Sequence, residues 1–222
     1  MLPFLKTVGI LFVIFPERAE TLSFCLLKCA PIICLLTFVY MFGINSTHDG
    51  YYSHGIFVGL LCSLLGDFML VWPSLFVPGT IAFGLSHCAY SWAFGMTPFY
   101  PYIFLFSLVP FTVTLAITSS MSTIIRLTCI IYSLALSNML WRAWSRAHHE
   151  SRITWTWTSL ASFIGAFLFN LSDGLLAFEL AYHPSINLYH GVLVTYYAAQ
   201  MCITASIVDT RNDVWKRLRI DN

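Results

Sequence analysis

Long apolar runs follow one another along almost the whole chain, separated by short segments that carry proline, glycine or charge. A membrane-spanning helix needs about 20 consecutive apolar residues, so 222 residues leave room for roughly eight spans and no large domain outside the bilayer. Only 9% of the residues are charged, against about 25% in soluble domains, and the mean hydropathy is +0.76. We therefore predict an all-α, polytopic integral membrane protein in a single transmembrane domain. The predicted spans are residues 2–15, 21–42, 52–72, 75–96, 101–118, 121–145, 153–178 and 185–209.

The basic residues predict the orientation of these spans. Seven of the eleven lysines and arginines flank the sixth connection (Arg142, Arg146, Arg152) or lie in the tail, residues 210–222. Cytosolic loops are enriched in such residues, so we expect both regions, and with them the C-terminus, in the cytosol. A net charge of +1 suggests neither nucleic acid nor a strongly acidic partner. The partner predicted from composition is the lipid bilayer, and oligomeric state is not predictable.

Asp67 and Asp173 each lie inside an apolar run, where an aspartate costs about 3 kcal/mol on insertion scales. Their surroundings match, because a glycine, Gly59 or Gly165, lies eight residues before each acid. The matching segments suggest two parallel four-helix halves, an arrangement that places sites at the interface between repeats. Counted from the predicted span ends, both acids lie roughly 7 Å below the outer boundary. We expect them to face one cavity.

Several polar residues are candidates to support these acids. Ser63 and Asn170 each lie one turn before an acid on the same helix face, which predicts a hydrogen bond to it. Lys28 lies near the same level and has two interpretations: it pairs with a carboxylate or a phosphate, or its ammonium group extends to the lipid headgroups.

Two histidines in the predicted spans are candidate acids, bases or ligands. His87 is followed one turn later by Tyr90, and His190 is followed two turns later by Tyr197. Packing without a chemical role is the alternative for each. A zinc site needs three or four converging ligands, and no spacing here predicts one, so we predict neither a metal nor a cofactor.

Motifs along nearly the whole chain resemble one family of membrane enzymes. The chain is similar to the YhhN-type lysoplasmalogenases, including their animal members, in Lys28-Cys-Ala-Pro31, Gly59-Leu-Leu-Cys-Ser-Leu-Leu-Gly-Asp67, Ser86-His87-Cys-Ala-Tyr90, Ala93-Phe-Gly-Met-Thr-Pro98, Trp141-Arg142-Ala143, Phe169-Asn-Leu-Ser-Asp173 and Thr195-Tyr-Tyr-Ala-Ala-Gln200.

The resemblance implies an eight-span enzyme, in animals of the endoplasmic reticulum, that hydrolyses the vinyl ether of lysoplasmalogen. Its products are a fatty aldehyde and glycerophosphoethanolamine or glycerophosphocholine. The resemblance places the two catalytic acids at Asp67 and Asp173. It places supporting positions at Lys28 and His87, and the last motif adds Tyr196, Tyr197 and Gln200 as candidates.

The implied reaction suits two carboxylates in a medium of low dielectric. Protonation of the vinyl ether β-carbon makes an oxocarbenium ion, which water captures, and the resulting hemiacetal collapses. Two neighbouring carboxylates share one proton, so one donates it while the other stabilises the cation and activates water. The residues do not decide which aspartate takes which part. The alternative function is a proton-coupled transporter that uses the aspartates as a relay.

Overall fold

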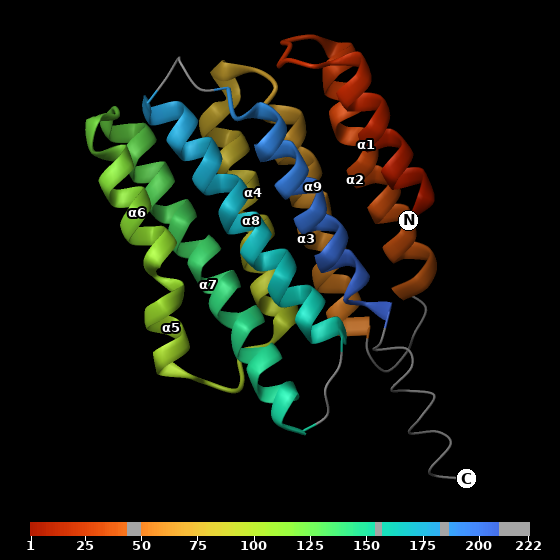
Figure 1. Cartoon of the computed structure of the whole chain (residues 1–222), viewed down its shortest axis with the longest axis vertical. Helices are drawn as coiled ribbons and strands as arrows, with labels where there is room; N and C mark the ends of the chain where they lie inside the picture. Colours follow the sequence, from red (N-terminus) through yellow and green to blue (C-terminus); the bar gives the residue numbers. More distant parts are fainter. Residues whose placement is uncertain (44–49, 154–156, 183–186, 209–222) are drawn as a thin grey trace.

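The computed structural model describes residues 1–43, 50–153, 157–182 and 187–208, and all regular secondary structure among them is helical, which confirms the predicted all-α class (Figure 1). The α-helices are α1 (Leu2–Ile14), α2 (Leu22–Gly43), α3 (Gly50–Met69), α4 (Phe76–Phe94), α5 (Pro101–Ser107), α6 (Val109–Ile117), α7 (Thr123–Ile153), α8 (Trp157–Tyr182) and α9 (Tyr189–Ala205). Two short 3-10 helices, η1 (Pro73–Leu75) and η2 (Thr118–Ser120), lie in the connections.

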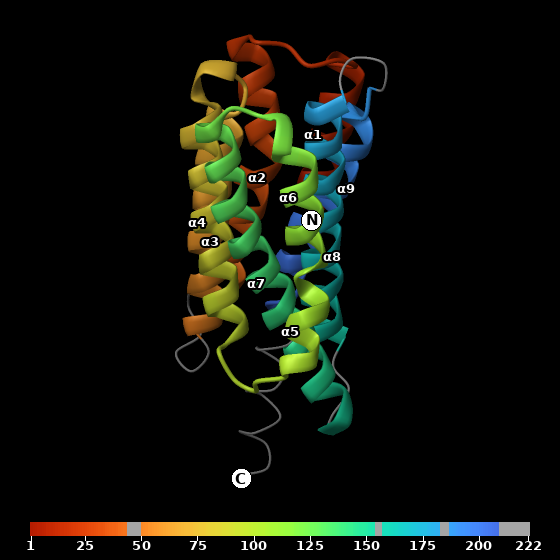
Figure 2. The same cartoon turned by 90° about the vertical axis from the view of Figure 1, so that its left-hand side faces the viewer.

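The helices run up and down the long axis of the molecule in alternation, except that α5 and α6 follow each other in the same direction (Figure 1). Helices α2, α3, α4, α7, α8 and α9 pack in that order, and α9 returns to α2, so these six close a ring. Helix α1 packs outside this ring against α2, and α5 and α6 lie outside it against α7, with α6 also contacting α8 (Figure 2).

The length and surface of the helices fit a bilayer. In the described part of the chain, four stretches are long and apolar enough to cross a membrane: Leu22–Phe42, Gly50–Met69, Thr123–His149 and Trp157–Ala181. Helix α1 and the pair α5–α6 are shorter apolar segments. Large apolar side chains point outward, with Val13 83% exposed and Ile131 69% exposed. Such a surface needs lipid around it.

The predicted fifth span, residues 101–118, is not one helix. It breaks at Leu108 into α5 and α6, because Pro110 has no N–H to give to the carbonyl one turn earlier and its ring crowds that carbonyl. Leu108 N instead bonds Leu105 O at 3.3 Å, which tightens the last turn of α5. The break makes α6 a short helix that can lie at its own angle.

Helix α7 continues to Ile153, past the predicted end at residue 145, because no proline or glycine interrupts residues 146–153. Arg142, which the sequence suggested as a loop-flanking charge, is fully buried within this helix. Its Nε donates to Gly95 O at 2.6 Å and its Nη1 to Pro98 O at 3.0 Å. The arginine therefore fastens the α4–α5 connection. The predicted basic tail, residues 210–222, lies outside the described residues.

The glycines that precede the two acids have the same role in two helix pairs. A Cβ on Gly59 of α3 would lie 2.2 Å from the ring of Tyr90 on α4. A Cβ on Gly165 of α8 would lie 2.9 Å from Ala199 O on α9. Small residues let membrane helices approach closely, so each glycine marks the tight contact of its pair. The two close contacts account for the glycine that lies eight residues before each acid. That the two halves of the chain arose by duplication stays a prediction.

Candidate active site

An apolar cavity of about 560 Å³ lies among the helices, and both Asp67 and Asp173 line it. Its walls come from α6, α7 and α8, with contributions from α2, α3, α4 and α9. Asp67 lies in the last turn of α3, whereas Asp173 lies more than two turns before the end of α8. The predicted equal distance from the span ends is therefore wrong, because α3 ends earlier and α8 later than the apolar pattern indicated. Both acids nevertheless reach one cavity.

Asp67 forms an ion pair that is largely closed off from solvent. Lys28 Nζ on α2 lies 3.3 Å from Asp67 Oδ1, and the two side chains are 12% and 2% exposed. The hydroxyl of Tyr196 on α9 donates to Asp67 Oδ2 at 2.5 Å. Of the two interpretations of Lys28, the structure shows the carboxylate pair.

A buried hydrogen-bond network is connected to this ion pair through Tyr196. Gln200 Nε2 donates to Tyr196 Oη at 3.3 Å and to Ser63 Oγ at 2.9 Å, while Tyr90 donates to Gln200 Oε1 at 2.7 Å. Ser63 and Ser86 hydroxyls lie 2.8 Å apart. The network joins α3, α4 and α9, and it fixes the ring of Tyr196 against Asp67.

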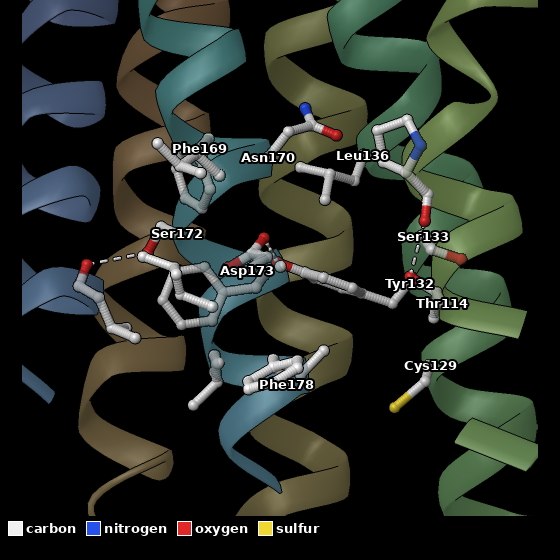
Figure 3. A pocket seen from close by; sticks show the side chains of 18 of the residues that line it. Thr114, Cys129, Tyr132, Ser133, Leu136, Phe169, Asn170, Ser172, Asp173 and Phe178 are labelled. Atoms are coloured by element: carbon white, nitrogen blue, oxygen red, sulfur yellow. Dashed lines mark hydrogen bonds between the residues drawn. The ribbon is translucent and has the colours of Figure 1, made fainter. Parts of the chain in front are cut away.

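Asp173 has a different set of partners, of which Figure 3 shows Tyr132. Tyr132 extends from α7 across the cavity and donates to Asp173 Oδ2 at 2.5 Å. His87 Nε2 on α4 lies 2.8 Å from the same tyrosine oxygen and 3.9 Å from Asp173 Oδ2. Since Tyr132 has one hydroxyl proton and gives it to Asp173, His87 Nε2 carries a proton and donates it to Tyr132.

Aromatic rings separate the two acid groups. The Phe169 ring lies 4.7 Å from that of His87 and 5.4 Å from that of Tyr196, centroid to centroid. Among the described residues, no side-chain hydrogen bond connects the Asp67 group to the Asp173 group. The two carboxylates can therefore be bridged only by a molecule bound in the cavity that both line.

The predicted same-helix partners of the acids do not pair with them. Ser63 bonds Ser86 and Gln200, and Asn170 Nδ2 donates to Ala166 O at 2.9 Å within α8. Asn170 Oδ1 is buried and has no hydrogen-bond partner among the described residues. A short aspartate side chain reaches its helical neighbour poorly, whereas a tyrosine on a facing helix spans the gap. Tyr196 and Tyr132, on other helices, make the hydrogen bonds to the acids instead.

Two other candidates lie away from the cavity wall. Tyr197 donates to Lys28 O at 2.8 Å and so positions α2 rather than a ligand. His190 is exposed and stacks on Phe12 of α1 at 5.6 Å, so the structure separates it from both acids.

Tyr132 is the residue that sequence reasoning missed. It lies within an apolar run and outside every motif that supported the prediction. Its signal was weak: a tyrosine hydroxyl inside a span needs a hydrogen-bond partner, and an acid on a neighbouring span is one. In the described part of the chain, no cluster of three or more His, Cys, Asp or Glu residues could hold a metal ion.

The fold and this site define a class: an all-α membrane protein with one buried and one partly buried acid facing an apolar cavity. Residues 23–207 match the YhhN family, and the chain belongs to that family, as its motifs predicted. It is 33% identical over 206 residues to lysoplasmalogenase TMEM86B of Homo sapiens, covering 92% of this chain and 84% of that protein. It is 32% identical over 224 residues to lysoplasmalogenase TMEM86A of Bos taurus, covering 96% and 90%. No solved structure matches the chain.

Proposed function

We propose that this protein is a lysoplasmalogenase, an ether hydrolase that adds water to the vinyl ether of lysoplasmalogen. The products are a fatty aldehyde and glycerophosphoethanolamine or glycerophosphocholine. One observation carries the proposal: Asp67 and Asp173 line the same apolar cavity, so a lipid bound there has access to both carboxyl groups. The names of the relatives point to the same substrate.

The partners of the two acids support different roles for them. Asp67 has a cation within 3.3 Å, which favours its ionised form. Asp173 has the neutral hydroxyl of Tyr132 at 2.5 Å, and among the described residues its one ion-pair partner is the imidazole of His87 at 3.9 Å. A carboxyl group in an apolar cavity without a close cation favours its neutral form. We therefore assign Asp173 as the acid and Asp67 as the base.

In the proposed reaction each aspartate gives up one proton and takes up one proton, so its protonation state is restored. Asp173 gives its proton to the β-carbon of the vinyl ether, and the ionised Asp67 stabilises the oxocarbenium ion. Water adds to the cation as Asp67 takes its proton, which gives a hemiacetal. On collapse, Asp67 returns this proton to the glycerol oxygen and Asp173 takes the hemiacetal hydroxyl proton. The aldehyde leaves, and both acids regain their starting states.

Lys28, Tyr132 and His87 position the acids in this scheme. Lys28 keeps Asp67 ionised between turnovers, because losing the proton restores the ion pair. Tyr132 holds the carboxyl group of Asp173 toward the cavity, and His87 orients Tyr132 through the Nε2 hydrogen bond. We also propose that the enzyme acts in the endoplasmic reticulum membrane with a cytosolic C-terminus, from the resemblance and the charge distribution.

Purified protein in detergent tests the proposal directly. It should release free aldehyde from 1-alkenyl-lysophosphatidylethanolamine, measured by chromatography of the hydrazone, and release none from the matching 1-alkyl ether. The alkyl ether has no double bond to protonate. A protein that binds the alkenyl lipid without releasing aldehyde would contradict the proposal and favour the proton-coupled transporter.

A further inference from the structure

Two helices of the cavity wall also face the bilayer along one shared seam. On α8, Phe167 and Leu171 line the cavity and yet are 54% and 43% exposed. On α6, Val109 and Val113 line it and are 56% and 46% exposed. Side chains that contact the cavity and the outside together mark a place where the wall is open.

The exposed positions on each helix form one stripe. On α8 the spacing of three or four residues continues from Leu171 to Gly174 and Phe178, which also line the cavity and are exposed. Residues at this spacing share a helix face. Figure 2 shows α6 beside α8 on the side that faces the viewer. Both stripes line the same cavity, and α6 contacts α8.

Gly174 is the gap in this seam. Among the described residues, a Cβ built on it would meet nothing within 4 Å, whereas those on Gly59 and Gly165 would collide with neighbouring helices. Gly174 is also the residue after Asp173. The opening is thus next to the acid that we assign as the proton donor.

Hydroxyl groups that line the cavity donate hydrogen bonds to backbone carbonyls of their own helices. The hydroxyl of Thr114 donates to Pro110 O at 3.0 Å, and that of Ser133 donates to Ile130 O at 3.0 Å. Their hydroxyl protons are already used, so the surface offered to a ligand is mostly methyl, methylene and ring carbon. A hydrocarbon chain suits such a surface, because its burial releases water or replaces lipid contact without a polar cost.

We propose that the seam between α6 and α8 is a lateral opening through which the substrate's alkenyl chain reaches Asp173 from the bilayer. The chain lies across Gly174 with its far end still in lipid, while the vinyl ether enters the cavity. This inference rests on the proposed function. It requires that the length of the chain matters little, since the slot has no closed end.

Filling the gap at Gly174 tests the opening. Gly174→Leu should lower kcat/KM for a hexadecenyl lysoplasmalogen by roughly tenfold or more, the scale of losing a pocket for several methylenes. The same variant should keep its activity on a propenyl analogue, whose chain is too short to lie in the seam. Leu171→Trp, one turn before Gly174 on the same helix face, should give the same split. Gly9→Leu is the matched control, because Gly9 on α1 also has open space around a Cβ.

Each outcome decides one of the two proposals. If Gly174→Leu and Leu171→Trp reduce both substrates equally, or neither, the seam does not hold the chain. A wild-type preference among dodecenyl, hexadecenyl and octadecenyl substrates of more than roughly tenfold would also contradict it, because a closed pocket discriminates by length. If the wild-type protein releases aldehyde from none of them, the proposed function fails instead.

Discussion

Tyr132 on α7 donates its hydroxyl proton to Asp173 on α8 over 2.5 Å. The same oxygen accepts a hydrogen bond from His87 on α4, so three helices converge on one carboxyl group. A membrane interior leaves few alternatives for such groups, because an unpaired hydroxyl there costs free energy. The arrangement supports a defined position for this carboxyl group.

Removing either acid should stop hydrolysis. We expect Asp67→Asn and Asp173→Asn to lower kcat by at least about 100-fold, since each replaces a proton donor or acceptor in the reaction by an amide. Aldehyde release from purified protein measures this. Glu179→Gln is the control, because Glu179 pairs with Arg18 at 3.2 Å outside the cavity wall. Normal turnover in either variant would remove that aspartate from the mechanism.

Removing the Tyr132 hydroxyl should slow the reaction without weakening binding. Tyr132→Phe takes a hydrogen bond from Asp173 and leaves His87 Nε2 without its acceptor, so we expect kcat to fall roughly 10- to 100-fold with little change in KM. Initial rates over a range of substrate concentrations separate the two constants. Tyr40→Phe, on the exposed face of α2, should leave both unchanged. A change confined to KM would mean that Tyr132 binds substrate instead.

Removing Lys28 should cost stability as well as activity. Lys28→Met leaves Asp67 buried without a cation, a change on the order of 3–5 kcal/mol for a buried pair. We expect a lower Tm in detergent and a lower kcat, while the exposed Lys6→Met on α1 changes neither.

A double variant separates the two effects of Lys28. Lys28→Met with Asp67→Asn removes both charges, so we expect Tm to recover toward the wild-type value while hydrolysis stays absent. Thermal unfolding followed by intrinsic fluorescence gives the comparison. A double variant that unfolds as early as Lys28→Met would show that the lysine stabilises the fold through some other contact.

The close contact at Gly165 should tolerate no side chain. In Gly165→Ala the new Cβ would lie 2.9 Å from Ala199 O and 3.0 Å from Ile203 N, and backbone atoms cannot rotate away. Helices α8 and α9 would have to separate, so we expect a lower Tm and a lower kcat through Tyr196 on α9. Gly9→Ala, with open space around its Cβ, should be neutral or slightly stabilising. Equal Tm values for the two variants would contradict the close packing.

Much of the site could be predicted from residues in local motifs. Asp67, Asp173, Lys28 and His87 stood out because polar groups are rare in apolar runs, and the structure brings all four to or beside the cavity. The hydrogen bonds predicted within a single helix are not formed, because Ser63 and Asn170 share a face with their acids but bond elsewhere. His190 stacks on α1, and a chemical role for it stays a prediction.

The sequence by itself determined that this chain is a helical membrane protein with two acids inside it, because run length, composition and spacing are properties of neighbouring residues. Only the tertiary structure decided what each acid contacts. Tyr196 is 129 residues from Asp67, and Tyr132 is 41 residues from Asp173. Whether such residues meet depends on how each helix is rotated and how closely its neighbours approach, as at Gly59 and Gly165. The open space beside Gly174 is likewise a product of tertiary packing that no local pattern encodes.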